Sequence, residues 1–172
     1  MSRSLDPSSP LGAPLLSAIS ETLDGYLTAQ EPMLTAIGAT ALLDVAREGT
    51  AGGKRLRPAY CYWSYVAAAG LPGDDAPLLK VASSLDLLHV SALVHDDLID
   101  AADTRRGLPA AHKRFEQLHA ARRGRGSEAE FGTSSAILLG DLLLMWSVDL
   151  VDSSGAPHLD RARPHLSAMR AE

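Results

Sequence analysis

The sequence predicts an all-α fold, and three features of its 172 residues support this class. Alanine and leucine are abundant while only 5% of the residues are aromatic, which favours helices over sheets. Apolar residues recur with helical spacing near the start of the chain, where one stripe is formed by Leu15, Leu16, Ile19, Leu23 and Leu27. No segment shows a convincing strand-turn-strand pattern. The length suits one domain with a sizeable core.

The expected elements follow from turn and cap residues along the chain. Residues 1–14 are rich in proline and serine and are expected to form a flexible lead-in, so that the domain itself covers residues 15–172. Asp74 or Asp75 can cap the long helix that begins near Ala76. Helical segments are expected at about 15–30, 33–48, 59–69, 76–100, 110–121, 133–151 and from about 159 onwards.

Charge and composition exclude several classes of protein. The net charge is 16 minus 21, or −5, which argues against nucleic acid as a partner and means that an anionic substrate needs local arginines or metal ions. The single cysteine, Cys61, cannot form an intrachain disulfide and fits a reducing compartment. The N-terminus is a poor signal peptide and the apolar runs are too short for a membrane span, so we expect a soluble, cytoplasmic protein.

An aspartate cluster marks the end of the long helix, in the stretch LVHDDLIDAADTRRG at 93–107. Asp96 and Asp100 are i and i+4 neighbours on one helix face, whereas Asp97 points about 100° away. Mg²⁺ takes oxygen ligands and typically combines one or two carboxylates with substrate phosphates. The alternative is a solvated acidic turn, but the helix dipole disfavours aspartate at this end.

Two adjacent arginines, Arg105 and Arg106, follow this cluster. Their guanidinium groups suit phosphate oxygens, although they could instead pair with Asp100 and Asp103. The two interpretations are compatible, because ion pairs in the free protein can give way to phosphate contacts in the loaded one.

A second basic stretch, GGKRLRP at 52–58, places Lys54, Arg55 and Arg57 beside two glycines. Glycines allow backbone amides to approach an anion closely, yet a lone basic turn is often plain surface. His89 lies seven residues before Asp96, about 10.5 Å along the helix and nearly on the same face. Such a histidine is either a core residue or a further donor to a phosphate group.

The stretches GGKRLRP, LLHVSALVHDDLIDAADTRRGLPAAH and AILLGDLLL, in this order across 52–144, resemble the trans-isoprenyl diphosphate synthases, also called polyprenyl synthetases. The loop HAARRGRGSEAEFGTSSAILLGD looks most like the bacterial geranylgeranyl diphosphate synthase branch. The resemblance implies an isoprenoid-synthase helical bundle, here with its N-terminal helices only. It also implies a homodimeric prenyltransferase that condenses isopentenyl diphosphate with an allylic diphosphate by Mg²⁺-assisted ionisation, condensation and proton loss.

The resemblance further implies roles for individual residues. Asp96 and Asp100 would bind Mg²⁺ with Asp97 in support, and Arg105 would contact the allylic diphosphate and complete the catalytic set. The diphosphate of isopentenyl diphosphate would be bound by Lys54, Arg57, His89 and Arg106. A chain-length pocket would be lined by Ser91, Ala92 and Leu88; because Ser91 and Ala92 are small, the product is expected to be geranylgeranyl diphosphate or longer.

The match is incomplete, because family members are longer and carry a second aspartate-rich motif that these residues lack. We therefore expect a truncated synthase that is inactive by itself and associates through exposed apolar faces. Two other classes stay open: a noncatalytic partner subunit of a heteromeric prenyl synthase, and a terpene cyclase. The intact DDxxD motif argues against the first, and GGKRLRP argues against the second. The preferred primer, the exact product length, the oligomer geometry and the pathway stay open.

Overall fold

The computed structural model describes residues 5–171, and in this part the chain forms seven helices and one very short hairpin. The elements are α1 (Ala13–Ala36), α2 (Thr40–Thr50), α3 (Leu56–Ala69), α4 (Ala76–Ile99), β1 (Thr104–Arg105), β2 (Leu108–Pro109), α5 (Ala111–Ala121), α6 (Glu128–Asp152) and α7 (Leu159–Ala171). The predicted all-α class is confirmed. The hairpin is a correction, since no strand pair was expected.

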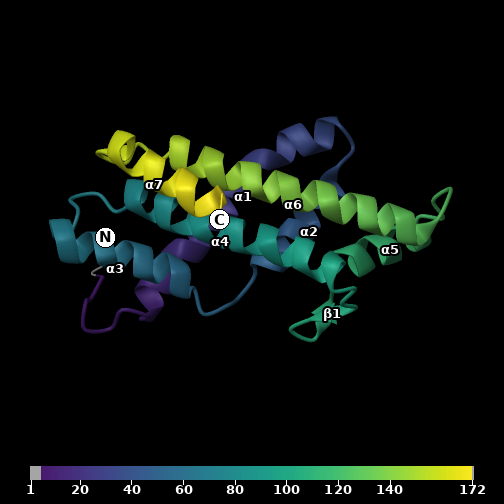
Figure 1. Cartoon of the computed structure of the whole chain (residues 1–172), viewed down its shortest axis with the longest axis horizontal. Coiled ribbons are helices and arrows are strands. Elements are labelled where there is room, and N and C mark those ends of the chain that lie inside the picture. Colours follow the sequence, from purple (N-terminus) through teal and green to yellow (C-terminus); the bar gives the residue numbers. More distant parts are fainter. Residues whose placement is uncertain (1–4, 172) are drawn as a thin grey trace.

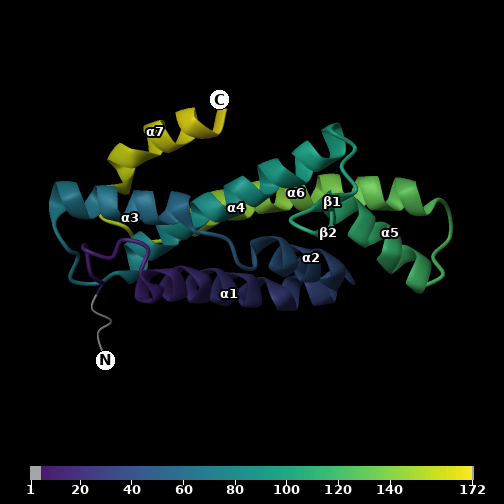
Figure 2. The ribbon, with the colours of Figure 1, turned by 90° about the horizontal axis from the view of Figure 1, so that it is seen from below.

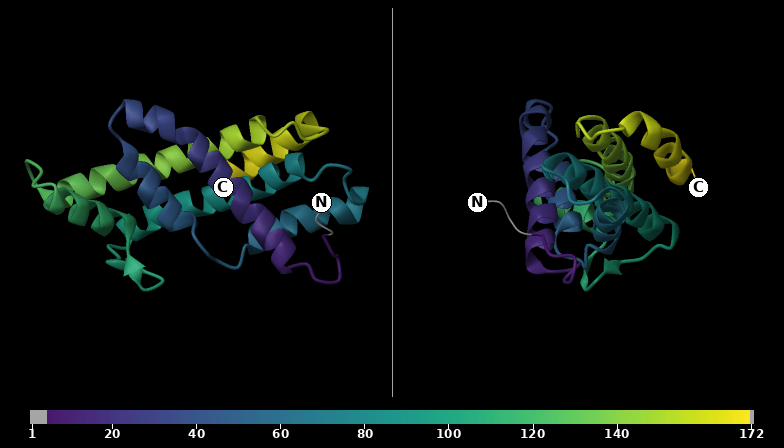
Figure 3. Two further views of the ribbon diagram at one scale, coloured as in Figure 1. Left: turned by 180° about the vertical axis from the view of Figure 1, so that it is seen from behind. Right: turned by 90° about the vertical axis from the view of Figure 1, so that its left-hand side faces the viewer.

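Two long helices, α4 and α6, form the centre of an elongated bundle (Figure 1). Helices α1 and α2 lie along one side of this pair, as Figure 2 shows, and α1 crosses it obliquely in the rear view of Figure 3. Helix α3 lies at one end of the bundle, and α5 and the hairpin lie at the other (Figure 1). The C-terminal end of α4, which carries the aspartate cluster, therefore faces the hairpin and α5.

The core forms where α1, α4 and α6 meet. Fully buried side chains come from all three helices, among them Ile19, Leu27, Leu87, Leu139 and Leu143. Burying one such side chain stabilises the fold by roughly 1.5–3 kcal/mol. The helical stripe predicted near the N-terminus contributes four buried side chains to this core, those of Leu15, Ile19, Leu23 and Leu27.

Helices α4 and α6 are also long and apolar enough to cross a membrane, judged by length and composition alone. They pack against each other in the middle of the bundle, and about half of each apolar stretch is buried there (50% and 44%). Core helices of soluble proteins have the same properties, so these two helices are weak evidence for a membrane span.

The break between the first two helices lies later than the sequence predicted. Helix α1 continues through Pro32 and ends at Ala36, whereas a break before residue 33 was expected. The true end is set by Gly38, whose φ of +71° fits the left-handed position of a Schellman motif. The Gly38 amide donates to Thr35 (3.1 Å), and the Ala39 amide donates to Leu34 (2.8 Å).

Helix α6 begins at Glu128, five residues before the predicted start. Ser127 is its N-cap, and the Ser127 hydroxyl accepts a hydrogen bond from the Glu130 amide (3.3 Å). Glu128 and Glu130 lie in the first turn, where the helix dipole favours acidic groups. The mixed charges around them had suggested a loop.

The start of α4 agrees with the prediction, but the two candidate caps have different partners. Asp75 occupies the N-cap position without capping the helix, and its carboxylate accepts a hydrogen bond from the Tyr62 hydroxyl. Asp74 instead accepts one from the Ala76 amide (3.0 Å).

The described part of the lead-in, residues 5–12, forms turns beside the bundle. Leu5 is buried there, and the Trp63 indole donates to the Pro10 carbonyl (2.7 Å). Flexibility of the lead-in and the domain limits stay predictions.

Candidate functional site

Residues predicted to bind one diphosphate group lie around a single open pocket, which we call the basic pocket. Its walls come from the 49–57 segment, from Asp86, His89 and Val90 of α4, and from Arg106 of the hairpin, and its volume is about 360 Å³. Four residues that the sequence had singled out are among them: Lys54, Arg57, His89 and Arg106. Segments separated by some fifty positions in the chain thus meet at one place.

The segment between α2 and α3 shapes this pocket through left-handed backbone conformations. Gly52 and Gly53 have φ values of +69° and +85°, and Arg55 has a φ of +50°. Glycine adopts this region without steric penalty, whereas a residue with a side chain does so at a cost of about 1–2 kcal/mol. The reversal leaves Lys54 and Arg57 exposed at the pocket.

The electrostatics of the basic pocket favour an anion. Partial burial lowers the pKa of His89, and the nearby Arg57, Arg106 and Arg105 lower it further, while Asp86 acts in the opposite direction. The imidazole is therefore neutral near pH 7 in the free protein. A bound anion would offset the surrounding positive charge and favour protonation.

The predicted catalytic aspartates lie at the end of α4 and Arg105 lies in β1, and the environments of these residues differ. Arg105 donates from Nε to both carboxylate oxygens of Asp97 (2.8 and 2.9 Å) and from a terminal nitrogen to Asp96 (3.2 Å). Asp97 is buried, whereas Asp96 and Asp100 are exposed. The hydrogen bond from Arg105 to Asp97 is the main reason that the pKa of Arg105 is raised.

Asp96 and Asp100 can supply only some of the ligands that a Mg²⁺ ion needs. They share one exposed helix face, but within residues 5–171 no three His, Cys, Asp or Glu side chains are grouped closely enough to hold a metal ion. This arrangement fits Mg²⁺ that takes most of its ligands from water and substrate phosphates. Both oxygens of Asp97 are already engaged by Arg105.

A second pocket links the helix end to the basic pocket. Its polar lining consists of Glu48, Asp97, Arg105 and Arg106, and most of the remaining lining is apolar. Arg106 borders both pockets, so the two arginines after the cluster connect the acidic helix end with the basic pocket. Asp96 and Asp100 line neither pocket.

The three residues of the predicted chain-length pocket differ in burial on α4. Ser91 is buried against α6, where its hydroxyl donates to the Gly140 carbonyl (2.7 Å). Ala92 is exposed and Leu88 is partly buried. Neither of the two pockets above is lined by any of these residues, so their role stays a prediction.

One interaction at the basic pocket was not predicted from the sequence, the ion pair between Arg55 and Asp86. Arg55 and Asp86 form an ion pair of 2.7 Å and are both largely shielded from solvent. The sequence had grouped Arg55 with Lys54 and Arg57 as a basic turn, either suited to an anion or plain surface, without a partner on α4. The available signal was Asp86 itself, because an aspartate inside an apolar helix requires a partner.

Comparisons with known proteins agree on one family. Residues 39–167 match the family model described as polyprenyl synthetase. Geranylgeranyl pyrophosphate synthase 11 of Arabidopsis thaliana, a chloroplastic protein, is 36% identical over 130 residues, which is 74% of this chain and 29% of that protein. Geranylfarnesyl diphosphate synthase of Natronomonas pharaonis is 30% identical over 152 residues, or 81% of this chain and 38% of that protein.

Solved structures that resemble this chain are also prenyl diphosphate synthases. A geranylgeranyl pyrophosphate synthase from Corynebacterium glutamicum, complexed with isoprenyl diphosphate and magnesium, superposes with a TM-score of 0.83 at 34% identity. The geranylgeranyl pyrophosphate synthetase of Pyrococcus horikoshii superposes with a TM-score of 0.63 at 26% identity. These alignments cover 96% of this chain but only 47% and 44% of those chains, so the chain spans less than half the length of these structures.

Proposed function

The chain belongs to the polyprenyl synthetase family, and from this premise we propose that the protein condenses isopentenyl diphosphate with an allylic diphosphate. One observation carries the proposal: Lys54, Arg57, His89 and Arg106 surround one pocket, and Arg106 joins it to the acidic end of α4. Three arginine or lysine charges and a neutral histidine can bind a diphosphate, even though residues 1–172 together carry a net charge of −5.

The proposed roles are those that the resemblance to the family implies, and the grouping of the cations around one pocket supports them. Lys54, Arg57, His89 and Arg106 hold the diphosphate of isopentenyl diphosphate. Asp96 and Asp100 would hold Mg²⁺, which would neutralise charge on the allylic diphosphate. Asp97 supports the site by fixing the guanidinium of Arg105, which contacts that leaving group.

The reaction breaks the allylic C–O bond, and the electron pair leaves with the diphosphate. The double bond of isopentenyl diphosphate attacks the allylic cation and forms a new C–C bond. A proton is then lost to the departing diphosphate, which leaves a product five carbons longer. Apolar helix faces exclude water, which would otherwise capture the cation.

Product length is the finer part of the proposal. Small side chains at Ser91 and Ala92 leave room for geranylgeranyl diphosphate or a longer product. Ala92→Phe is the cleaner test, because Ala92 is exposed whereas Ser91 is packed against Gly140. Chromatography of the products should show a shorter chain for Ala92→Phe in the full-length enzyme, and an unchanged length would refute the pocket assignment.

The activity belongs to the whole protein, because residues 1–172 cover only 47% of the C. glutamicum synthase. We propose that a further aspartate-rich group outside these residues completes the metal site, so that residues 1–172 alone are inactive. Cytoplasmic location and a homodimer are part of the same proposal.

The test is an assay of the full reading frame with radiolabelled isopentenyl diphosphate, with and without Mg²⁺. Lys54→Gln and Arg57→Gln should each raise KM for isopentenyl diphosphate by about tenfold, since each removes a charged hydrogen bond of about 1.5 kcal/mol. Lys80→Gln is the matched control, because Lys80 contacts the Ser153 carbonyl (3.3 Å) rather than the pocket. Mg²⁺-dependent turnover supports the proposal; no turnover would favour a noncatalytic partner subunit, and cyclic products a terpene cyclase.

A further inference from the structure

We propose that Arg55 and Asp86 are positioning residues of the basic pocket, whose buried ion pair fixes the 51–57 segment against α4. The pair thereby sets where Lys54 and Arg57 meet His89. This inference rests on the proposed function of the basic pocket and assigns neither Arg55 nor Asp86 a direct contact with the substrate.

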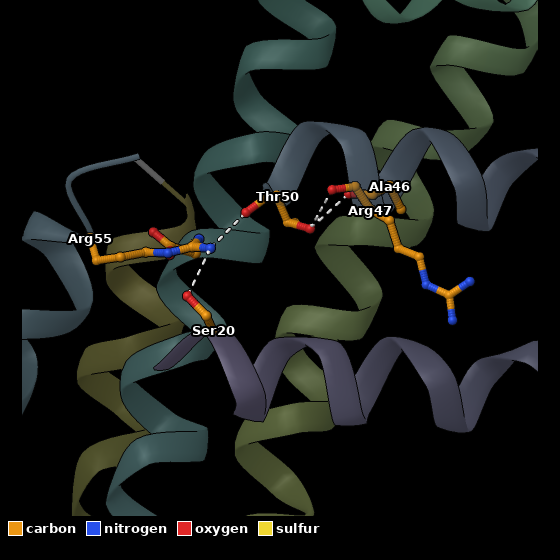
Figure 4. Close-up of polar contacts among 6 residues, drawn as sticks. Ser20, Ala46, Arg47, Thr50 and Arg55 are labelled. Carbon is orange, nitrogen blue, oxygen red and sulfur yellow. Dashed lines mark hydrogen bonds and ion pairs between the residues drawn. The ribbon is translucent and has the colours of Figure 1, made fainter. Parts of the chain in front are cut away.

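The guanidinium of Arg55 contacts three helices, of which α2 and α4 line the pocket and α1 lies behind it. One terminal nitrogen donates to Asp86 of α4 (2.7 Å), and the other donates to the carbonyl of Thr50 at the end of α2 (2.7 Å). The second nitrogen also lies 3.5 Å from the hydroxyl of Ser20 on α1. Figure 4 shows the Arg55 side chain reaching from its loop to Thr50 and Ser20. A lysine could not make these contacts together, because it lacks the fork of donors.

Burial makes this arrangement specific. The side chains of Arg55 and Asp86 are only 9% and 11% exposed, so each charge depends on the other for compensation. The backbone of Arg55 has a φ of +50°, which is unfavourable for a residue with a side chain. Such a conformation is kept only where surrounding contacts enforce it. The ion pair with Asp86 and the hydrogen bond to Thr50 are the contacts that enforce this backbone conformation.

Arg55 and Asp86 lie close in sequence to the proposed diphosphate-binding residues of the 51–57 segment and of α4. Lys54 precedes Arg55, and Arg57 follows two positions later. Asp86 lies three residues before His89, on the same side of α4. Arg55 and Asp86 also line the pocket, but their opposite charges compensate each other. Their contribution is therefore to position Lys54, Arg57 and His89.

The variant Asp86→Asn distinguishes a positioning role of Asp86 from a purely electrostatic effect of its charge on anion binding. Removing a carboxylate from the pocket should strengthen anion binding by Coulomb attraction alone, and more so if Arg55 becomes free to bind the anion. Positioning predicts the opposite sign. We expect inorganic diphosphate to bind the variant roughly tenfold more weakly, as is typical when an outer-shell partner is lost.

The measurement is calorimetric titration of residues 1–172 with inorganic diphosphate in magnesium-free buffer, at a temperature where circular dichroism shows each variant folded. Glu31→Gln is the matched control: it also removes one negative charge and one arginine ion pair, that with Arg47 (3.2 Å), away from the pocket. The control should bind diphosphate within about twofold of the parent. Unchanged or tighter binding by folded Asp86→Asn overturns the inference.

A second variant keeps the inference testable if Asp86→Asn does not fold. Arg55→Lys retains the charge but loses the fork, so it should also weaken diphosphate binding by several-fold, and parent-like affinity in this folded variant overturns the inference. The outcomes also separate the two proposals. If the parent does not bind diphosphate, the proposed function of the pocket fails; if the parent binds and the variants bind equally well, only the positioning role fails.

Discussion

At the residue scale, two adjacent aspartates at the end of α4 have different environments. The side chain of Asp97 is 4% exposed and that of Asp96 is 55% exposed, although both contact Arg105. A buried carboxylate without its arginine would be costly, whereas an exposed carboxylate is already solvated. Asp97 therefore belongs to the framework of the site, and Asp96 and Asp100 are the carboxylates free to face a ligand.

Asp97→Asn should lower the free energy of unfolding by about 2 kcal/mol, because it replaces a charged hydrogen-bonded pair with a weaker contact. Urea unfolding measures this change. Asp100→Asn is the control and should leave stability unchanged or slightly higher, since an acidic side chain at a helix C-terminus is unfavourable. Equal losses for both variants would contradict the different roles.

His89 gives a pH-dependent prediction. Its pKa is lowered from 6.5 in the folded protein, so the unfolded chain binds a proton more readily. The stability associated with neutral His89 is full above pH 6.5 and falls as the pH drops from 6.5 towards the lowered pKa. The loss of unfolding free energy between pH 7.5 and pH 5.5 should therefore be smaller in His89→Gln than in the parent.

Denaturant unfolding at the two pH values tests this expectation. His165→Gln is the matched control, because His165 is exposed on α7 and should leave the parent's pH dependence in place. Added inorganic diphosphate should reduce the loss in the parent, because the anion stabilises the charged imidazole. Identical pH profiles for parent and His89→Gln would refute the assignment.

Much of the site was predictable at this scale, and the remainder depends on backbone conformation. The resemblance to the family implied that Lys54, Arg57, His89 and Arg106 would bind one diphosphate, and these four residues do line one pocket. The sequence could not show which arginine of GGKRLRP turns inward. That choice depends on the positive φ of Arg55, and propensities do not indicate a left-handed residue that is not glycine.

At the element scale, periodicity located the helices, and local caps set their limits. The predicted 76–100 helix is observed as α4, because its apolar pattern and its acidic start are both clear. The predicted limits were wrong at Pro32, through which α1 continues, and at Glu128, where α6 begins five residues early. Packing favours the longer α1, because Leu34 is buried beyond Pro32. The Ser127 cap allows α6 to begin among charged residues.

The contact between α4 and α6 depends on glycine at position 140. A Cβ added to Gly140 would overlap the ring of His95 on α4. Gly140→Ala should therefore reduce the free energy of unfolding by about 1–3 kcal/mol, because the helices or the ring must move. Thermal or urea unfolding of the purified chain measures the loss.

Gly25 offers a matched control in the middle of α1, where an added Cβ meets nothing within 4 Å. Gly25→Ala should stabilise the chain by roughly 0.5–1 kcal/mol, since alanine is the better helix former. If Gly140→Ala were as stable as Gly25→Ala, the close approach of α4 and α6 would not be limiting.

At the scale of the whole molecule, local charge and global charge have opposite signs. The chain carries −5 overall, yet the basic pocket is lined by four cations, of which only Arg55 is compensated by Asp86. Long-range steering of an anionic substrate is therefore weak, and capture depends on close contacts within about a Debye length, roughly 10 Å at 0.1 M salt. This arrangement makes the geometry of the pocket more important than the net charge.

The central pair of helices also presents apolar side chains to solvent. On α6, Leu138 and Met145 are 60% and 61% exposed and lie seven residues apart on one face. Single exposed apolar residues are ordinary, but several on one long helix indicate a surface that another chain or segment covers. These residues are where the predicted association between copies is best tested.

Replacing both Leu138 and Met145 with glutamate should shift sedimentation profiles of residues 1–172 towards monomer, because burying two carboxylates in an interface is unfavourable. The control is Leu71→Glu, which changes a leucine of 59% exposure in the loop between α3 and α4. That variant should associate as the parent does. If the double variant and the parent sediment alike over the same concentration range, this face of α6 does not mediate association, and the homodimer proposal must rest on a different surface.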